Sequence, residues 1–479
     1  MTRFFFTLLL TTALQVGFAQ QEWSLQRCVQ YAWDNNLTVQ QAELTTRNAE
    51  LTTRQNQFNR LPTVNGSTSL GYQFGRTIDP TTNTFNNTRI GFNSYGINGS
   101  VTLFSGNFIN NQIKQSQFNL LAAEKDAENT RQTVALNVAN AYLNILLSEE
   151  QLANAQTQLE LARQQLDRTD RLIGVGQLAG NARLDLEAQV ARNEQLVIEA
   201  QNALDLTLLN LKQLLQLDPA QPLSLVRPDL AVAEATLVRN FTTEDVYRAA
   251  LQSQPAVEAA QLRLEGNKLS EQIAESGRLP TLSLFGNLNS NYSSIAKDFN
   301  NPNTDNVMQV PGDPVTVEVG GIRQDVIFFN TVGITYPNQG FGDQLSENFG
   351  QSVGLSLSVP IYNNHRNNIN AERARLNVIS AELTSRQVTD QLKTDVETAI
   401  TSFRAARNAY QASQRSLNAA EAAFADAERR FELGAINSFE YNNAVNNQDI
   451  ARRDLTRAKY QLLFNLKVVE FYLGQPLNL

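Results

Sequence analysis

The sequence contains very few of the residues from which most catalytic and metal sites are built. Among its 479 residues are one cysteine (Cys28), one histidine (His365), two methionines and two tryptophans. A single cysteine excludes an intrachain disulfide and any metal site made of several thiolates. A single histidine excludes sites that need two imidazoles, and its place just after a predicted strand favours a polar junction residue over a proton switch. We find no catalytic constellation, so we expect no enzyme activity, no metal and no cofactor.

Long apolar runs are also missing. No stretch after the N-terminus holds eighteen uninterrupted apolar residues, so we expect no transmembrane helix. The apolar run at 4–14 follows Arg3 and precedes the small-residue site Gly17-Phe18-Ala19, which predicts a secretory signal peptide over residues 1–19. Cys28 lies past that site and is interpreted as a small buried residue of the first helix.

Basic residues are in the minority. The chain has 39 lysines and arginines against 47 aspartates and glutamates, a net charge of −8, and it has no basic cluster. An acidic exported chain is a poor candidate for binding nucleic acid.

Glycine and proline are absent from two very long segments. Residues 107–173 and 363–433 contain neither, and each predicts one long helix or helices joined without a break. The second would reach about 105 Å at 1.5 Å per residue. Turns near 174–181 and 434–437 precede further helical segments, so the sequence predicts two antiparallel helical hairpins. In the first long segment leucines recur at steps of about seven residues, which favours a coiled-coil seam.

Four segments alternate apolar and polar residues, the pattern of a strand with one apolar and one polar face. They lie near 63–75, 92–104, 281–291 and 352–361, and Phe285 interrupts the polar face of the third. A helix is predicted over 24–59 with Ser24 as its N-cap, and another begins at the capping sequence Thr242-Thr243-Glu244-Asp245. The loop at 292–349 is long and polar, although 315–319 and 326–334 within it have strand character.

The whole pattern occurs twice. Phe104 lies 72 positions before Gly176, and Tyr362 lies 72 positions before Gly434. Arg60-Leu61-Pro62-Thr63 also recurs as Arg278-Leu279-Pro280-Thr281. We therefore divide the mature chain into a first repeat at 20–241 and a second at 242–479, each with a helix, two strands and a long helical hairpin.

Four strands per chain are too few to close a barrel, which needs about eight. An open sheet edge in lipid would leave backbone groups without partners. Either several chains complete one barrel, or the strands belong to a soluble sandwich. Aromatic residues near the strand ends suit the interfacial girdles of a membrane barrel; these are Tyr72, Phe74, Phe104, Phe349 and Tyr362.

The order and duplication of these segments resemble the TolC family of outer-membrane efflux proteins. The resemblance covers nearly all of the mature chain and includes both Arg-Leu-Pro-Thr junctions, Val359-Pro360-Ile361-Tyr362, and the turns at Gly176 and Gly434. It implies an α+β membrane protein in which a long antiparallel α-helical barrel continues a 12-stranded β-barrel made by a homotrimer. It further implies an outer-membrane location with the helices in the periplasm, a periplasmic adaptor, and an inner-membrane pump of the RND or ABC class.

The resemblance also implies a periplasmic gate near the two turns. The family's Asp-x-x-Asp-Ala pattern falls on Glu440 and Asn443 before Ala444, so the second acid is replaced. In the first repeat Glu187 takes the second acidic position, with Asp185 one step from the first. A threefold axis would make each pore-facing carboxylate a ring of three. The alternative is that these are ordinary exposed residues near a helix N-terminus. We add Phe431 to the gate candidates, and expect Gly174, Gly176, Gly434 and Ala435 to dock the adaptor.

The expected function is therefore a passive exit duct for efflux or type I secretion, opened by its adaptor and pump. The sequence does not identify the substrate. The alternative is a secreted coiled-coil adhesin or structural protein, which would be water-soluble without detergent and would not conduct ions.

Overall fold

The computed structural model describes residues 22–78, 83, 85–87, 89–177, 180–227 and 237–475. The predicted signal peptide at 1–19 lies outside the described residues. The described chain forms two compact units, one within Met1–Thr52, Gln115–Lys268 and Leu376–Leu479, the other within Thr53–Lys114 and Leu269–Arg375. The first is helical and the second contains the strands. Each takes segments from both sequence repeats, so the units follow the type of secondary structure rather than the duplication.

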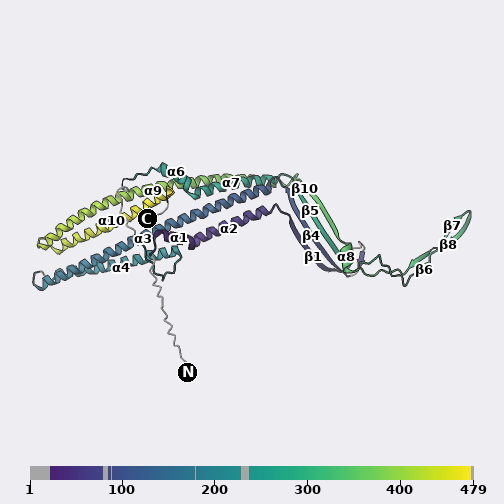
Figure 1. Ribbon diagram of the computed structural model, residues 1–479, viewed down its shortest axis with the longest axis horizontal. Helices are drawn as coiled ribbons and strands as arrows, with labels where there is room; N and C mark the ends of the chain where they lie inside the picture. Colours follow the sequence, from purple (N-terminus) through teal and green to yellow (C-terminus); the bar gives the residue numbers. More distant parts are fainter. Residues whose placement is uncertain are drawn as a thin grey trace, which may run out of the picture. The chain divides into compact units, whose positions relative to one another are not determined.

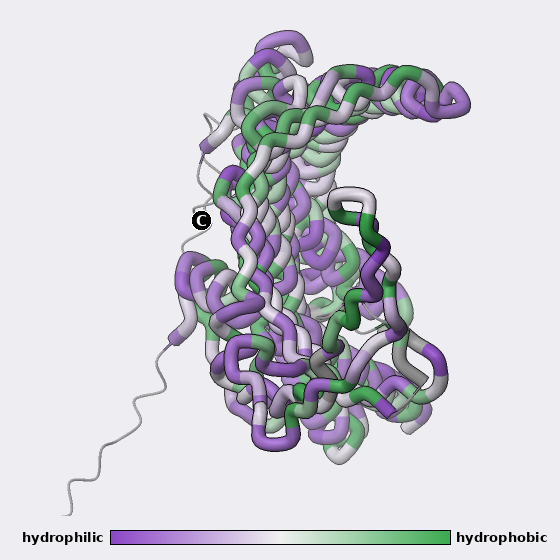
Figure 2. The backbone as a smooth tube through the Cα atoms, turned by 90° about the vertical axis from the view of Figure 1, so that its right-hand side faces the viewer, coloured by the Kyte–Doolittle hydropathy of each residue, from purple (hydrophilic) through white to green (hydrophobic). Residues whose placement is uncertain are grey.

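Two long helical hairpins make up most of the helical unit (Figure 1). The first pairs α3 (Phe108–Gly174) with α4 (Ala182–Leu215), and the second pairs α9 (Arg366–Glu432) with α10 (Ser438–Tyr472). Figure 2 shows hydrophilic and hydrophobic residues mixed along these helices. Among the helices of the described residues, none is long and apolar enough to cross a membrane.

The segment that the sequence predicted as one helix at 24–59 is broken into α1 (Leu25–Asn35) and α2 (Leu37–Phe58). Asn36 causes the break, because its backbone is extended and its side chain accepts a hydrogen bond from Thr38 N at 2.9 Å. Its amide also donates to Leu214 O at 2.9 Å, which ties the break to α4. The second repeat breaks at Gln254, between α6 (Thr243–Ser253) and α7 (Pro255–Ser276). The predicted N-caps Ser24 and Thr242 are confirmed.

Each repeat has its own hydrophobic core at corresponding positions. The first core includes Val138, Ile145 and Leu211, and the second includes their counterparts 258 positions later: Val396, Phe403 and Val469. Cys28 on α1 corresponds to Val246 on α6, 218 positions later. Burial raises the pKa of the Cys28 thiol to about 12. The thiol is therefore protonated and unreactive near neutral pH.

The β unit contains one antiparallel sheet of order β1-β4-β5-β10 (Figure 1). Its strands are β1 (Thr63–Gln73), β4 (Ile90–Phe104), β5 (Thr281–Ser293) and β10 (Gly350–Ser358). The last strand stops short of the predicted 361, since Pro360 has no N–H to donate to a ladder. The pairing register places most of the apolar residues of the four strands on one face. Much of that face is solvent-exposed, notably Leu70 and Val353 at 79% and 78%.

The polar face of the sheet contains two phenylalanines that pack on glycines. Phe285 lies over Gly354 of β10, and Phe92 lies over Gly71 of β1. An aromatic ring in this position covers the backbone of a neighbouring glycine that has no side chain of its own. The apparent interruption of the polar face at Phe285 is therefore a cross-strand pair.

The loop predicted at 292–349 contains more structure than the sequence indicated. It holds β6 (Met308–Pro311), β7 (Val315–Val319), β8 (Ile322–Val326), β9 (Phe329–Val332) and the short helix α8 (Phe341–Glu347). A smaller hairpin, β2 (Arg76–Ile78) with β3 (Phe85–Asn87), follows β1.

Candidate functional site

Both long hairpins end in the same backbone turn. Gly176 and Gly434 have φ angles of +75° and +69°, the left-handed region that favours glycine. The next residue donates its N–H back across the helix end: Gln177 N to Leu172 O at 2.9 Å, and Ala435 N to Arg430 O at 2.8 Å. This is the Schellman type of helix end. Among the described residues beyond the chain neighbours, no heavy atom lies within 4 Å of the position of a Cβ on either glycine, so the backbone conformation is what requires glycine there.

At the first turn the acidic candidates differ in their environment. Glu187 accepts a hydrogen bond from Arg183 Nε at 2.8 Å, and Asp170 of α3 lies 3.7 Å from the same nitrogen. These two carboxylates raise the pKa of Arg183, with the Glu187 hydrogen bond as the largest cause. Asp185 is exposed in the first turn of α4, where the helix dipole favours a negative charge. The charge of Glu187 is thus largely compensated by Arg183.

At the second turn Glu440 belongs to the cap of α10. The Asn437 side chain accepts a hydrogen bond from Glu440 N at 2.9 Å, and its amide lies 3.4 Å from Glu440 Oε1. This arrangement satisfies a free donor of the first helical turn and fixes the carboxylate beside the helix N-terminus. Asn443, one turn further on, is exposed.

Aromatic rings join α9 to α10 beside the second turn. The ring of Phe431 stacks on Tyr441 with centroids 4.8 Å apart and planes 22° apart, and Phe424 lies 6.1 Å from the same tyrosine. Phe431 is one of the predicted gate residues, whereas Tyr441 is not. The available signal was the seven-residue spacing of Phe424 and Phe431, which places both on one face of α9.

A groove of about 270 Å³ lies between the two hairpins near their turns. All four long helices line it, with Gln165 from α3, Leu186 from α4, Phe424 from α9 and Tyr441 from α10 among its residues. A hydrogen bond of 3.4 Å from Gln189 Nε2 to Asn446 Oδ1 links α4 to α10. Amide side chains are the commonest lining residues of this groove.

The turns also expose apolar side chains that the sequence analysis did not select. In the described part of the turns, four are at least 65% exposed: Val175 and Leu184 at the first turn, and Leu433 and Phe439 at the second. Gly174, Gly176, Gly434 and Ala435, the predicted docking residues, lie among them. Exposed apolar groups on a polar surface are typical of places where another protein binds.

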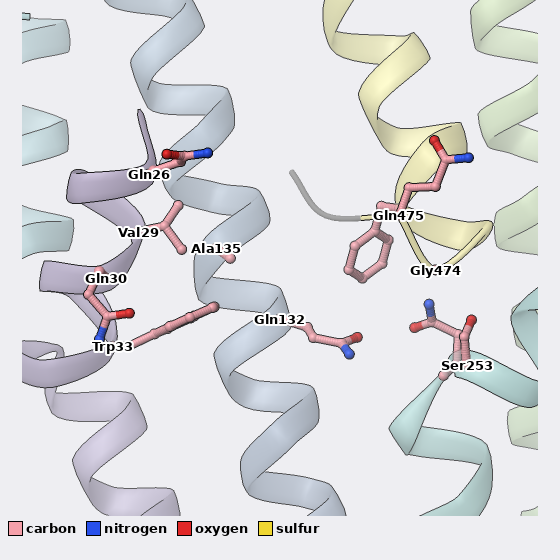
Figure 3. Close-up of a pocket in the computed structure, with 11 residues that line it drawn as sticks. Gln26, Val29, Gln30, Trp33, Gln132, Ala135, Ser253, Gly474 and Gln475 are labelled. Atoms are coloured by element: carbon pink, nitrogen blue, oxygen red, sulfur yellow. The ribbon is translucent and has the colours of Figure 1, made fainter. Parts of the chain in front are cut away.

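A second cavity, of about 460 Å³, lies among α1, α3, α6 and the end of α10 (Figure 3). Trp33, Gln132, Ser253 and Gln475 are among its lining residues. Within the described part of the chain, Gln132 Oε1 and Ser253 Oγ are buried without a hydrogen-bond partner. None of the predicted site residues lies in this cavity. The described residues also contain no group of three or more His, Cys, Asp or Glu that could hold a metal ion.

Comparison with known proteins identifies the class of molecule. Residues 28–216 and 332–475 match the family model of the outer membrane efflux proteins. Outer membrane protein TolC of Escherichia coli (strain K12) is 26% identical over 405 residues, which cover 79% of this chain and 70% of TolC. TolC of Salmonella enteritidis is 28% identical over 145 residues, which cover 30% of each chain.

Solved structures of outer-membrane channels share the fold. A CusC crystal structure aligns over 94% of this chain and 92% of its own, with a TM-score of 0.74 at 17% identity. The Campylobacter jejuni CmeC outer membrane channel aligns over 94% of this chain and 85% of its own, with a TM-score of 0.70 at 17% identity. VceC of Vibrio cholerae gives a TM-score of 0.72 at 13% identity, over 95% of this chain and 97% of its own.

The long hairpins, the open sheet and these matches define a TolC-like efflux channel protein. The chain belongs to the outer membrane efflux protein family. The expected resemblance and the expected bacterial outer-membrane location are thereby confirmed.

Proposed function

We propose that three copies of this chain form one exit duct across the outer membrane. The observation that carries the proposal is the four-stranded sheet, whose edge strands β1 and β10 have no further partner among the described strands. Pairing β1 of one copy with β10 of the next joins three sheets into a closed 12-stranded barrel, which leaves no free edge in lipid.

The two faces of the sheet support this arrangement. The exposed apolar face, with Val64, Leu70, Leu355 and Leu357, is suited to lipid. The opposite face carries serines and asparagines suited to a water-filled lumen, such as Ser69 and Ser94, whose hydroxyls lie 2.6 Å apart. The aromatic residues expected as girdles fall at both ends of the sheet: Tyr72, Phe74 and Phe349 at one end, and Phe104 and Tyr362 at the other.

In this proposal the long hairpins continue the duct as a helical barrel in the periplasm. Their turns, with the exposed Val175, Leu184, Leu433 and Phe439, bind a periplasmic adaptor protein. An inner-membrane pump of the RND or ABC class supplies the energy, and the duct itself is passive. Asp185, Glu187, Phe431, Glu440 and Asn443 narrow the pore at the turns until the adaptor and pump open it.

Size and conductance in one preparation test the proposal. We expect detergent-purified protein to have the mass of a trimer and to give discrete conductance steps in a planar bilayer. A monomer that stays soluble without detergent and does not conduct would contradict it, and would favour the alternative of a secreted coiled-coil adhesin or structural protein.

A further inference from the structure

Between β5 and β10 the chain leaves the main sheet as a two-stranded arm, residues 294–340. The pairing begins where Gln339 N donates to Ala296 O at 2.9 Å and continues where Asn303 N donates to Thr335 O at 2.8 Å. The β6–β9 ladder and then the β7–β8 ladder follow. The arm turns at Gly320-Gly321, both of which have positive φ. Two such residues are typical of the tight turn that matches the twist of a hairpin.

The end of the arm is amphipathic. The register Val315↔Val326, Val317↔Gln324 and Val319↔Ile322 places five β-branched apolar residues on one face. That face carries no charge, and its side chains are 36% to 74% exposed. The other face is polar: Thr316 Oγ1 donates to Asp325 Oδ1 at 2.6 Å, and Arg323 Nε lies 3.3 Å from Glu318 Oε2.

We expect this apolar face to pack against another surface. An isolated two-stranded hairpin is marginally stable in water, and independent stability requires further strands or packing on another surface. The apolar exposure continues down the arm at Met308, Val310, Phe328 and Phe329, which are 44% to 66% exposed. Residues 217–331, which contain β6 to β8 and most of the arm, lie outside the segments that match the family model.

The position and charge of the arm indicate which surface packs against its apolar face. After the arm the chain passes through α8 into β10, the edge strand through which each copy pairs with its neighbour in the proposed trimer. Three identical arms therefore start near the three seams. Tethering to one barrel gives the arms a high effective concentration for each other. The arm has two basic and five acidic residues, which disfavours binding to an anionic membrane surface. β-Branched faces also pack well on one another across about 10 Å.

We propose that the three arms of the trimer pack together through the face formed by Val315, Val317, Val319, Ile322 and Val326. This proposal rests on the proposed trimer. The packed arms form a collar at the outlet of the duct and add an intersubunit contact beyond the β1–β10 seams.

Cysteine cross-linking tests the packing of the arms. Val317→Cys places a thiol on the apolar face, and Glu318→Cys, one residue away, places it on the polar face. Cys28 is buried with a raised pKa, so it does not compete for a water-soluble reagent. In outer membranes treated with a mild oxidant, we expect V317C to form disulfide-linked dimers and E318C to remain monomeric on denaturing gels. The dimer accounts for at most about two thirds of the chains, because a threefold set leaves one cysteine unpaired.

Labelling by a charged maleimide gives a second measurement. We expect V317C to react about tenfold more slowly than E318C, because the packed face must open before the reagent reaches it. Trimers of the double variant Val317→Ser with Val319→Ser should dissociate in detergent at a lower temperature than wild-type trimers.

The outcomes separate the two proposals. If the wild type has the mass of a trimer but V317C neither cross-links nor is protected from the charged maleimide, the proposed packing of the arms is wrong and the proposed trimer is retained. If V317C is protected without cross-linking and reacts only with a lipid-soluble maleimide, the membrane covers the face and the collar is again wrong. If the wild type is a monomer, both proposals fall.

Discussion

At the scale of the residue, the duplication is most visible where the backbone enters the left-handed region. Four pairs of such positions lie 258 residues apart: Gly106 and Asn364, Asn107 and His365, Gly176 and Gly434, and Gln216 and Gly474. Backbone conformation is retained even where the residue type differs. His365 therefore has a structural role at the start of α9, and its Nδ1 lies 3.3 Å from Asn368 Nδ2.

The turn glycines give a residue-scale prediction. Gly176→Ala and Gly434→Ala should each lower the free energy of unfolding by about 1–2 kcal/mol, the cost of a left-handed residue that carries a Cβ. Thermal unfolding followed by circular dichroism measures the change. Gly174→Ala is the matched control, because Gly174 is the last residue of α3 and has no positive φ. Replacing glycine by alanine in a helix stabilises by about 0.5–1 kcal/mol, and an equal loss in the control would contradict the explanation.

A buried tyrosine gives a second prediction at this scale. Tyr142 is almost fully buried on α3, and its hydroxyl lies 2.6 Å from Val226 O and 3.1 Å from Trp23 O. Tyr142→Phe keeps the ring but removes the hydroxyl that lies against the carbonyl oxygens of Val226 and Trp23. The substitution should lower the free energy of unfolding by about 1–2 kcal/mol. The control is Tyr31→Phe, since the half-buried Tyr31 contacts Trp23 through its ring, at 5.1 Å. A smaller loss in Y142F than in Y31F would show that the hydroxyl is unimportant.

At the scale of the element, the two long hairpins have the same turn but different helix starts. Asn437 caps α10 with its side chain, whereas Asn181 before α4 has a helical backbone and makes no side-chain cap bond. The first turn of α4 is supported instead by the contacts of Arg183 with Glu187 and Asp170. The second hairpin also has the Phe431–Tyr441 stack. The second turn therefore has a fixed helix start and an aromatic contact, and the first depends on exposed charges.

This difference predicts unequal effects of the same substitution. Asn437→Ala should destabilise by about 1 kcal/mol, because it leaves Glu440 N without its side-chain acceptor. Asn181→Ala should change stability by no more than about 0.5 kcal/mol, because no cap bond is lost. Hydrogen exchange in the first turns of α10 and α4 localises the effect, and equal protection changes in the two variants would refute the assignment of Asn437 as the functional cap.

At the scale of the whole molecule, symmetry turns single exposed charges into rings. The proposed trimer places three copies of Glu440 and of Asp185 around one axis. In that proposed trimer we expect Glu187, while paired with Arg183, to contribute less to the field at the pore, because Arg183 compensates its charge. The proposal therefore makes ion selectivity a property of the assembly that depends on local pairing within each chain.

Selectivity measurements test that statement. Glu440→Gln and Asp185→Asn should each lower the ratio of cation to anion permeability by about twofold, because each removes a ring of three charges. The reversal potential across a bilayer with a salt gradient measures the ratio. Glu187→Gln should lower the ratio at least as much, because it removes the same three charges and leaves the positive charge of Arg183 without this partner. An unchanged ratio in all three variants would contradict the charged rings at the turns.

Much of the architecture follows from patterns that short windows of sequence contain. The absence of glycine and proline from 107–173 and 363–433 indicated the long helices, which the structure places at Phe108–Gly174 and Arg366–Glu432. Alternation indicated the four strands to within a few residues. The break at Asn36 could not be predicted in the same way, because it depends on a hydrogen bond to Leu214 O, which is 178 residues away in sequence.

The candidate site was predictable in place more than in detail. The turns at Gly176 and Gly434 were predictable because glycine ends each long helical segment. The pairing of Glu187 with Arg183 and the cap at Asn437 are local signals, four and three residues apart, that were not used in the sequence analysis. The ring stack at Tyr441 depends on the distance between α9 and α10, which spacing alone does not encode.

The sequence by itself determined the duplication, the type of each long element and the family, because helix breakers, alternation and repeat distances are local or periodic properties. Only the tertiary structure decided that Phe285 covers Gly354, that the first helix breaks at Asn36, and that the arm after β5 presents one uncharged apolar face. Each of these depends on cross-strand register or on contacts between distant segments, which exist only once the chain has folded.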